Sequence, residues 1–220
     1  MIKAILFDMD GVLIDSPKYI IKAHDEILKK YGVIRTKEQQ AVSLGHSIRD
    51  LIGIWEKEFN LPKLDFETVS KKSFDLQIIT IKKEVHPDPV VISLIKNAKK
   101  NGIKIAVTTS STKERAKTFL DLVGVSKYLD AFITANDVNE HKPSPVPFLK
   151  TAELLGVDPN DCVVFEDATN GIDAANSAKM ISIALITDFN SKEEFIGKAD
   201  FIITNFSEVT PDFLSKLTKK

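Results

Sequence analysis

Three aspartates, Asp8, Asp10 and Asp15, lie within the stretch "FDMDGVLIDS", directly after an apolar run. In extended backbone the side chains at positions i and i+2 point the same way, so Asp8 and Asp10 face together. Two carboxylates on one side repel each other unless a cation lies between them or one of them holds a proton. The stretch therefore indicates either a turn rich in capping acids or half of a metal site.

Other polar residues that suit phosphoryl transfer follow later apolar runs, and they are Thr109, Ser110, Lys142, Glu166 and Asp167. Clustered carboxylates are the hard oxygen ligands that Mg²⁺ prefers. Hydroxyls and free N–H groups at a helix start bind anions, and a lysine adds a point charge suited to phosphate. In such a site Asp8 would attack phosphorus as a nucleophile, giving an aspartyl-phosphate. Asp10 would protonate the leaving oxygen and then deprotonate the attacking water.

Six short runs rich in β-branched residues predict the strands that position these residues. Near-continuous hydrophobicity over so few residues is typical of strands buried on both faces. Helical stretches lie between most of them, and the alternation predicts an α/β fold with a doubly wound, Rossmann-like parallel sheet. The strands are expected at residues 2–7, 103–108, 131–134, 162–165, 181–186 and 201–204, and the helices at 89–101, 112–123, 145–155 and 171–179.

One region is helical almost throughout and contains no convincing strand. In "YIIKAHDEILKKYG" the apolar residues recur at helical spacing and a glycine closes the segment. We therefore predict a small α-helical domain at residues 17–85, inserted into a catalytic core made of residues 1–16 and 86–220. Pro17 and the "HPDP" segment mark its edges. Asp15 and Ser16 are expected to cap its first helix.

Composition excludes several classes of protein. The 30 basic and 31 acidic residues nearly cancel, which argues against a nucleic-acid or membrane partner. No apolar stretch approaches the roughly 18 residues of a membrane span. The single cysteine, Cys162, excludes an internal disulfide and is expected to be a buried strand thiol. We expect a cytoplasmic protein.

Taken singly, each group of polar residues has an ordinary structural explanation. Asp-x-Asp-Gly is often a turn, "TTSST" a helix N-cap, and a lysine before proline a solvated loop residue. In an open parallel sheet, however, ligands bind beyond the carboxyl ends of the strands. Four separate strand ends each deliver a residue type that phosphoryl transfer needs, and this joint placement favours the active site.

The same segments resemble the motifs of a known family. "FDMDGVLIDS", "VTTSS", "HKPSP" and "FEDATNGI" are similar, in this order, to the four motifs of the haloacid dehalogenase superfamily. The resemblance runs nearly end to end and is to the branch that includes β-phosphoglucomutase and phosphoglycolate-type phosphatases. It implies that the helical insert is a cap domain, which closes over the active site and excludes water other than the nucleophile.

The resemblance also implies residue roles. Asp8 would be the nucleophile and Asp10 the acid/base, with its backbone carbonyl on the metal. Thr109 and Ser110 would hold the phosphoryl group, and Lys142 would neutralise it. The Mg²⁺ ligands implied are Asp8, Asp10, Glu166 and Asp167.

The cap segment "LGHSIRD" is similar to the loop that faces the substrate in this family. In the mutase-like pattern the arginine follows the serine directly, whereas here Ile48 intervenes; that pattern also has a histidine where this chain has Ile20. His24, one turn later, is compatible with a helix-surface histidine. These departures favour a phosphatase over a mutase. The substrate-binding candidates in the cap are Gly45, His46, Ser47, Arg49 and Lys72. Either Lys71 or Lys72 falls where the family has a cap lysine that reaches the substrate.

The sequence thus predicts a Mg²⁺-dependent phosphatase acting on small phosphorylated metabolites, such as a sugar phosphate or a phosphoglycolate-like compound, as a monomer or weak homodimer. A β-phosphoglucomutase-type mutase is the alternative. A phospho-aspartate receiver module is disfavoured by the insert at residues 17–85, and a dehalogenase needs neither Asp10 nor a metal pair.

Overall fold

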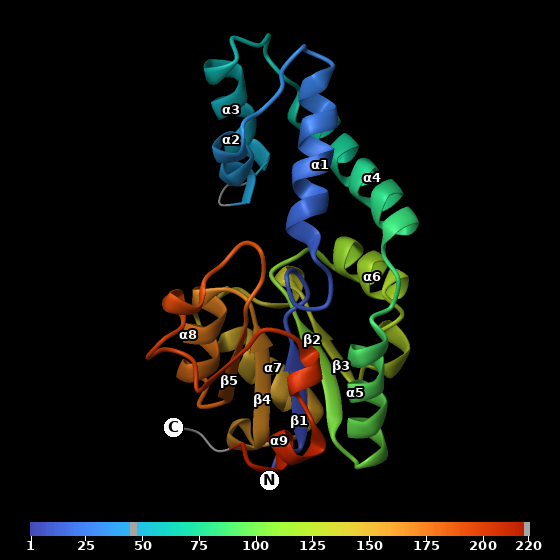
Figure 1. Ribbon diagram of the computed structural model, residues 1–220, viewed down its shortest axis with the longest axis vertical. Helices are drawn as coiled ribbons and strands as arrows, with labels where there is room; N and C mark the ends of the chain where they lie inside the picture. The colour runs from blue at the N-terminus through green and yellow to red at the C-terminus, as the bar shows by residue number, and fades with distance from the viewer. Residues whose placement is uncertain (45–47, 218–220) are drawn as a thin grey trace. The chain divides into compact units, whose positions relative to one another are not determined.

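The computed structural model describes residues 1–44 and 48–217. The chain divides into two compact units: residues 1–14 with 86–220, which contain a sheet, and residues 15–85, whose described part contains helices and no strand. Figure 1 labels the elements of both units. Among the described residues, no helix is both long enough and apolar enough to cross a membrane.

The six strands described in the first unit are all parallel and form one sheet in the order β3-β2-β1-β4-β5-β6. The order reverses beside β1, because β2 and β3 extend the sheet on one side and β4 to β6 on the other. This is the switch point at which doubly wound folds bind ligands. The predicted fold class is confirmed. The strands are β1 Ala4–Phe7, β2 Lys104–Thr108, β3 Ala131–Ile133, β4 Cys162–Glu166, β5 Ile181–Leu185 and β6 Phe201–Ile203.

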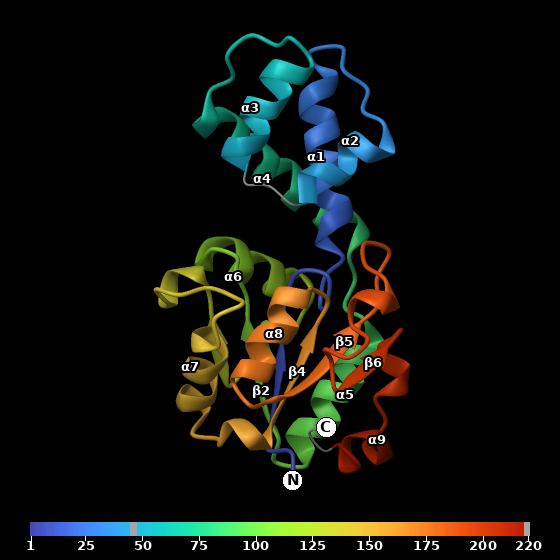
Figure 2. The same cartoon turned by 90° about the vertical axis from the view of Figure 1, so that its left-hand side faces the viewer.

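Helices cover both faces of this sheet (Figures 1 and 2). On one face, alternate strand residues such as Leu6 and Val164 pack with Phe148. On the other face the ring of Phe7 stacks on that of Phe165 at 5.3 Å and lies 6.0 Å from that of Phe206. Cys162 is buried in β4, as predicted. The helices of this unit are α5 Pro89–Lys100, α6 Lys113–Leu122, α7 Val146–Leu155, α8 Thr169–Ser177 and α9 Pro211–Ser215.

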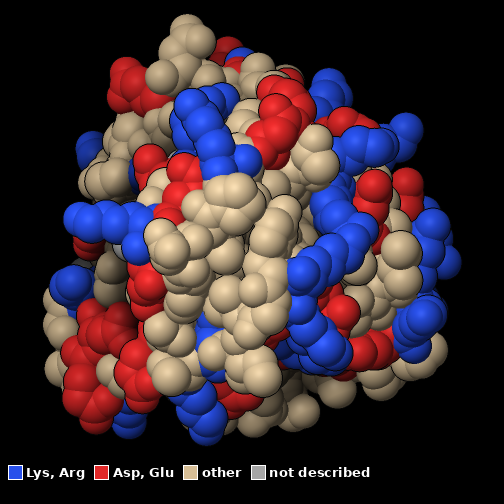
Figure 3. Space-filling model, turned by 90° about the horizontal axis from the view of Figure 1, so that it is seen from above, with Lys and Arg blue, Asp and Glu red and all other residues tan. Residues whose placement is uncertain are grey.

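The second unit has its own apolar core, built from residues at helical spacing. Leu28, Leu51 and Trp55 are among its most deeply buried side chains. In Figure 3, basic and acidic side chains are mixed around a central area of uncharged residues, and neither sign of charge dominates this face. The α-helices described in the second unit are α1 Ser16–Lys29, α2 Lys37–Ala41, α3 Ile48–Glu58 and α4 Phe66–Glu84.

The start of α1 differs from the prediction. Asp15 occupies the N-cap position, but its side chain makes no capping hydrogen bond. Its carboxylate instead pairs with the ammonium of Lys18 at 2.9 Å. The prediction of a side-chain cap is therefore wrong, because a lysine three residues later takes the same carboxylate.

His24 is buried within this unit, so the expectation of a helix-surface histidine is wrong. Only 3% of the residue is exposed. Its Nδ1 lies 3.1 Å from the hydroxyl of Ser43, and the ring meets that of Trp55 edge-on at 5.0 Å. Arg35 donates to the same hydroxyl and to the carboxylate of Asp25. Burial, and after it the nearby Arg35 cation, lowers the pKa of His24 to about 3.

We predict that His24 makes the protein sensitive to acid. The unfolded chain binds a proton here below about pH 6.5 and the folded protein only near pH 3, so acid favours the unfolded state. As the pH is lowered from 6.5 to 3, the free energy of unfolding should fall less steeply in His24→Gln than in the unmodified protein. The two slopes should differ by up to about 1.4 kcal/mol per pH unit. Urea titrations monitored by circular dichroism at several pH values measure this slope.

The matched control is His86→Gln, because His86 is exposed. This variant should keep the slope of the unmodified protein. An unchanged slope in His24→Gln would contradict the assignment of a neutral buried imidazole.

Candidate active site

The carboxylates of Asp8, Glu166 and Asp167 come together where β1 and β4 end. Phe7 is paired with Phe165 in the ladder, and the amide of Asp8 donates to the carbonyl of Phe165 at 2.9 Å. The residues that follow are therefore adjacent across the two strands. One carboxylate oxygen from each of the three acids lies within 4.8 Å of the other two. Oxygen donors at this spacing fit a hard divalent cation.

Lys142 is buried among these acids. Its Nζ lies 2.6 Å from Asp8 Oδ1 and 2.6 Å from Glu166 Oε1, and it also donates to the carbonyl of Thr108 at 3.0 Å. Only 4% of its side chain is exposed. The three donors of the ammonium are thus matched by three acceptors, which fixes the side chain in one place.

The site carries more negative charge than Lys142 compensates. Burial raises the pKa of Asp8 well above its usual range, and the neighbouring acids add to this while Lys142 opposes it. Burial, and after it Glu166, raises the pKa of Asp167 to about 7. Burial would lower the pKa of Lys142, but Asp8 and Glu166 outweigh it and raise the pKa. Three carboxylates sharing one ammonium favour a further cation.

Two glycines leave room for the carboxylates. Gly11 has a φ of +81°, and a Cβ there would lie 1.8 Å from Oδ2 of Asp167. Gly171, in α8, would place a Cβ 1.9 Å from Oε1 of Glu166. Any larger residue at either position would have to displace a carboxylate of the cluster.

Asp10 follows β1 as well, but its carboxylate is held by other partners. Arg115 Nη1 lies 2.7 Å from Asp10 Oδ2, and Nη2 lies 2.8 Å from Oδ1. The hydroxyl of Ser111 donates to Oδ2 at 2.7 Å. Sequence reasoning missed Arg115; the available signal was its position four residues after Ser111, in the first turn of the helix that follows β2.

The two predicted phosphate-binding residues follow β2, next to β1 in the sheet. Thr109 is 4% exposed, its amide donates to the carbonyl of Ile133 at 3.0 Å, and its hydroxyl accepts from the amide of Ser111 at 3.1 Å. Ser110 is exposed. The core candidates thus lie at the carboxyl ends of β1, β2 and β4 or, for Lys142, in the loop before α7.

The cap candidates belong to the second unit. Arg49, in α3, lies over the ring of Phe66 at 3.9 Å. Lys72, in α4, is half-buried, and its close approach lowers the pKa of Lys30. Lys71 lies 3.9 Å from Asp75. Three further candidates, Gly45, His46 and Ser47, lie outside the described residues.

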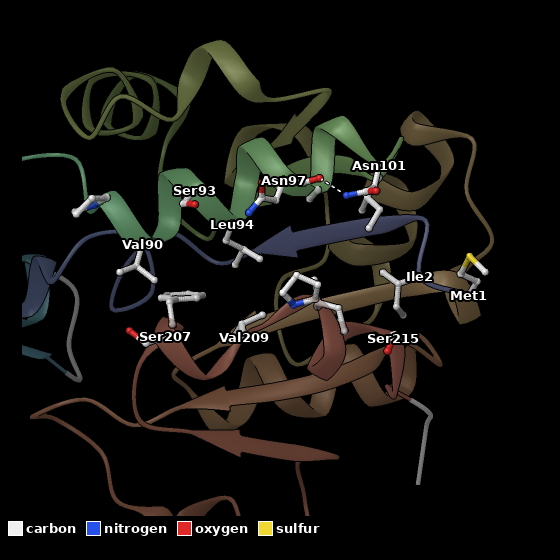
Figure 4. A pocket seen from close by; sticks show the side chains of 16 residues that line it. Met1, Ile2, Val90, Ser93, Leu94, Asn97, Asn101, Ser207, Val209 and Ser215 are labelled. Carbon is white, nitrogen blue, oxygen red and sulfur yellow. Dashed lines mark hydrogen bonds between the residues drawn. The ribbon is translucent and has the colours of Figure 1, made fainter.

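A separate cavity of about 670 Å³ lies between α5 and the segment formed by the 3₁₀ turn Phe206–Glu208 and α9 (Figure 4). Apolar side chains such as Leu94 and Val209 line it, together with the amides of Asn97 and Asn101. None of its lining residues has an ionisable side chain, so it offers no side-chain carboxylate, acid or base for phosphoryl transfer.

Comparisons with known proteins agree with this geometry. A family model described as haloacid dehalogenase-like hydrolase matches residues 5–185. Fructose-1-phosphate phosphatase YqaB of Escherichia coli is 34% identical over 180 residues, which are 81% of this chain and 94% of that protein. Phosphoglycolate phosphatase of Aquifex aeolicus is 30% identical over 178 residues, covering 80% of this chain and 81% of that protein.

Among solved structures, one described as a candidate β-phosphoglucomutase of Thermotoga maritima superposes with a TM-score of 0.87. It is 25% identical and covers 98% of this chain and 100% of that one. Fold, acidic cluster and relatives define a hydrolase of the phosphatase type. The chain belongs to the haloacid dehalogenase-like hydrolase family, which confirms the predicted resemblance and the prediction of an enzyme.

We predict that Gly11→Ala disrupts the acidic cluster. The new methyl group would collide with Asp167, so the variant should lose phosphatase activity and affinity for a divalent cation by about tenfold or more. Its free energy of unfolding should also fall, by more than the roughly 1 kcal/mol that a positive φ alone costs an alanine. Calorimetric Mg²⁺ titration, phosphate release and chemical denaturation measure the three effects.

Gly197→Ala is the matched control, because Gly197 has a φ of +77° and a Cβ added there would meet open space. This variant should show the backbone cost alone, with affinity for a divalent cation and activity retained. Equal effects of the two substitutions would show that contact with Asp167 is unimportant.

Proposed function

We propose that the protein is a Mg²⁺-dependent phosphatase that hydrolyses small phosphorylated metabolites through an aspartyl-phosphate on Asp8. One observation carries the proposal: a buried aspartate at the end of β1 shares its lysine, Lys142, with Glu166. A nucleophile next to a bound phosphate dianion needs compensating positive charge, and this arrangement supplies a fixed ammonium and oxygen donors for a metal.

In the first step, Asp8 attacks phosphorus. Lys142 holds Oδ1 of this carboxylate, so we assign Oδ2 as the attacking atom. An Oδ2–P bond forms, the bond from phosphorus to the substrate oxygen breaks, and a proton from Asp10 passes to that oxygen.

In the second step, water attacks the phosphorus of the aspartyl-phosphate. Asp10 takes the proton of this water and the Oδ2–P bond breaks. The carboxylate of Asp8 is regenerated, and inorganic phosphate is released. Asp10 thereby regains the proton that it gave in the first step.

The residues fit the metal. Mg²⁺ would be held by Asp8, Glu166, Asp167 and the backbone carbonyl of Asp10, and it would neutralise the charge of the phosphoryl group and the nucleophile. Support comes from the spacing of the three carboxylate oxygens and from the shortage of positive charge around them.

Thr109 and Ser110 would bind the phosphoryl oxygens beside the start of α6, and the fixed positive charge of Lys142 would help to neutralise them. Hydroxyls and amides at a helix N-terminus favour a bound dianion.

Phosphatase activity is favoured over mutase activity. The two relatives cited above, at 30% and 34% identity, are named phosphatases, for phosphoglycolate and fructose 1-phosphate. We therefore propose a sugar phosphate or a phosphoglycolate-like acid as substrate. Arg49 and Lys72, together with Gly45, His46 and Ser47, would select it through its remaining polar groups.

A mutase is the second candidate, because the structure that superposes with a TM-score of 0.87 is described as a candidate β-phosphoglucomutase. A mutase returns the phosphoryl group to the sugar, whereas a phosphatase delivers it to water.

We predict that Asp8→Asn abolishes turnover. The amide keeps the shape of the side chain but is a poor nucleophile, so phosphate release should fall by at least about 10³-fold. Asp188→Asn is the control, since Asp188 is exposed and should tolerate the change. Phosphate release with 4-nitrophenyl phosphate and Mg²⁺ measures both. Turnover retained in Asp8→Asn would disprove the nucleophile assignment.

A screen of phosphorylated metabolites separates the two candidate functions. With Mg²⁺ present, free phosphate should appear from several sugar phosphates or from phosphoglycolate, and chelation by EDTA should abolish it. The screen follows phosphate and isomerised sugar phosphate together. An isomer formed only with a bisphosphate primer would establish the mutase instead.

A further inference from the structure

Arg115 binds the carboxylate of Asp10 in a bidentate ion pair. The two N–H···O contacts are 2.7 Å and 2.8 Å long and involve both carboxylate oxygens. A third donor, the hydroxyl of Ser111, reaches Oδ2 at 2.7 Å. Parallel contacts of this kind are the strongest and most directional that a carboxylate makes with a side chain.

The guanidinium is itself fixed in place. It lies over the ring of Phe119, one turn further along α6, at 4.4 Å, and it donates to the hydroxyl of Ser111. Only 18% of the Arg115 side chain is exposed, against 31% for Asp10. Packing and hydrogen bonds therefore hold the Arg115 side chain next to Asp10, and it is not a solvated arginine.

This pairing opposes proton transfer by Asp10, because three donors hold its two carboxylate oxygens. To protonate a leaving oxygen, Asp10 needs a proton on one oxygen and that oxygen directed at the substrate. To act as a base, it needs a lone pair directed at water. In the observed arrangement both oxygens accept from the guanidinium, and Asp10 is not among the three acids whose oxygens cluster together.

We infer that Arg115 is a positioning residue that holds Asp10 in a resting arrangement, and that this ion pair must open before Asp10 transfers a proton. The inference rests on the role of Asp10 in the proposed function. Arg115 exchanges no proton itself, because a guanidinium stays protonated in proteins. It acts only by competing for the carboxylate.

The test compares two substrates that differ in their need for an acid. Phenolate is a poor leaving group that requires a proton, whereas 4-nitrophenolate leaves without one. The measured quantity is the ratio of kcat/KM for phenyl phosphate to kcat/KM for 4-nitrophenyl phosphate. Since kcat/KM covers only the steps up to aspartyl-phosphate formation, hydrolysis of that intermediate does not enter.

Arg115→Ala should raise this ratio about three- to fivefold, the factor that a partly exposed ion pair is worth. Arg115→Lys, which keeps the charge but loses the bidentate contact, should raise it less. Lys117→Ala is the matched control, because Lys117 is an exposed cation on the same helix and its removal should leave the ratio unchanged. An unchanged or lower ratio in both Arg115 variants overturns the inference.

Asp10→Asn separates this inference from the proposed function. If Asp10 is the acid, this variant should lower the ratio by at least about tenfold, as loss of a general acid does. A lowered ratio in Asp10→Asn with no rise in the Arg115 variants refutes the inference alone. An unchanged ratio in Asp10→Asn refutes the role of Asp10, and with it the inference. Purely structural damage from Arg115→Ala would lower kcat/KM for both substrates by the same factor. The ratio would then stay unchanged, which counts against the inference.

Discussion

Repulsion among the carboxylates at the ends of β1 and β4 is the constraint on which the rest of the structure depends. Asp8 and Glu166 are almost completely buried, and each is held by the ammonium of Lys142 at 2.6 Å. Removing one partner of such a buried pair typically costs about 3–5 kcal/mol, because a charge is then left uncompensated. The loop that carries Lys142 must therefore return to the centre of the sheet.

Much of this arrangement could be predicted, because parallel strands bring their carboxyl ends to one edge. The apolar runs identified each of the six strands in the described part of the chain, and the residues directly after them include Asp8 and Asp167. The predicted run 162–165 ended one residue before β4 does, since Glu166 is itself the last strand residue and is buried. Hydrophobicity alone cannot assign a buried charged residue to a strand; the compensating lysine, distant in the sequence, makes that burial possible.

Other features could not be predicted, since they depend on how a helix is rotated about its axis. The apolar pattern gives a helix one buried face, but it does not say which polar residue lies at the edge of that face. His24 is buried against Ser43 and Trp55, with Arg35 nearby. Arg115 reaches Asp10 because α6 follows β2, which pairs with β1. Such polar contacts between distant residues leave no local pattern in the sequence.

The two cations of the site differ in how firmly they are held. Lys142 is 4% exposed and its ammonium has three acceptors, so no reaction step can release it without leaving charges buried and unpaired. Arg115 is 18% exposed and pairs with the more exposed Asp10, where water can replace a lost contact at small cost. The more deeply buried ion pair therefore holds Asp8, the proposed nucleophile, and the more exposed one holds Asp10, the proposed acid/base.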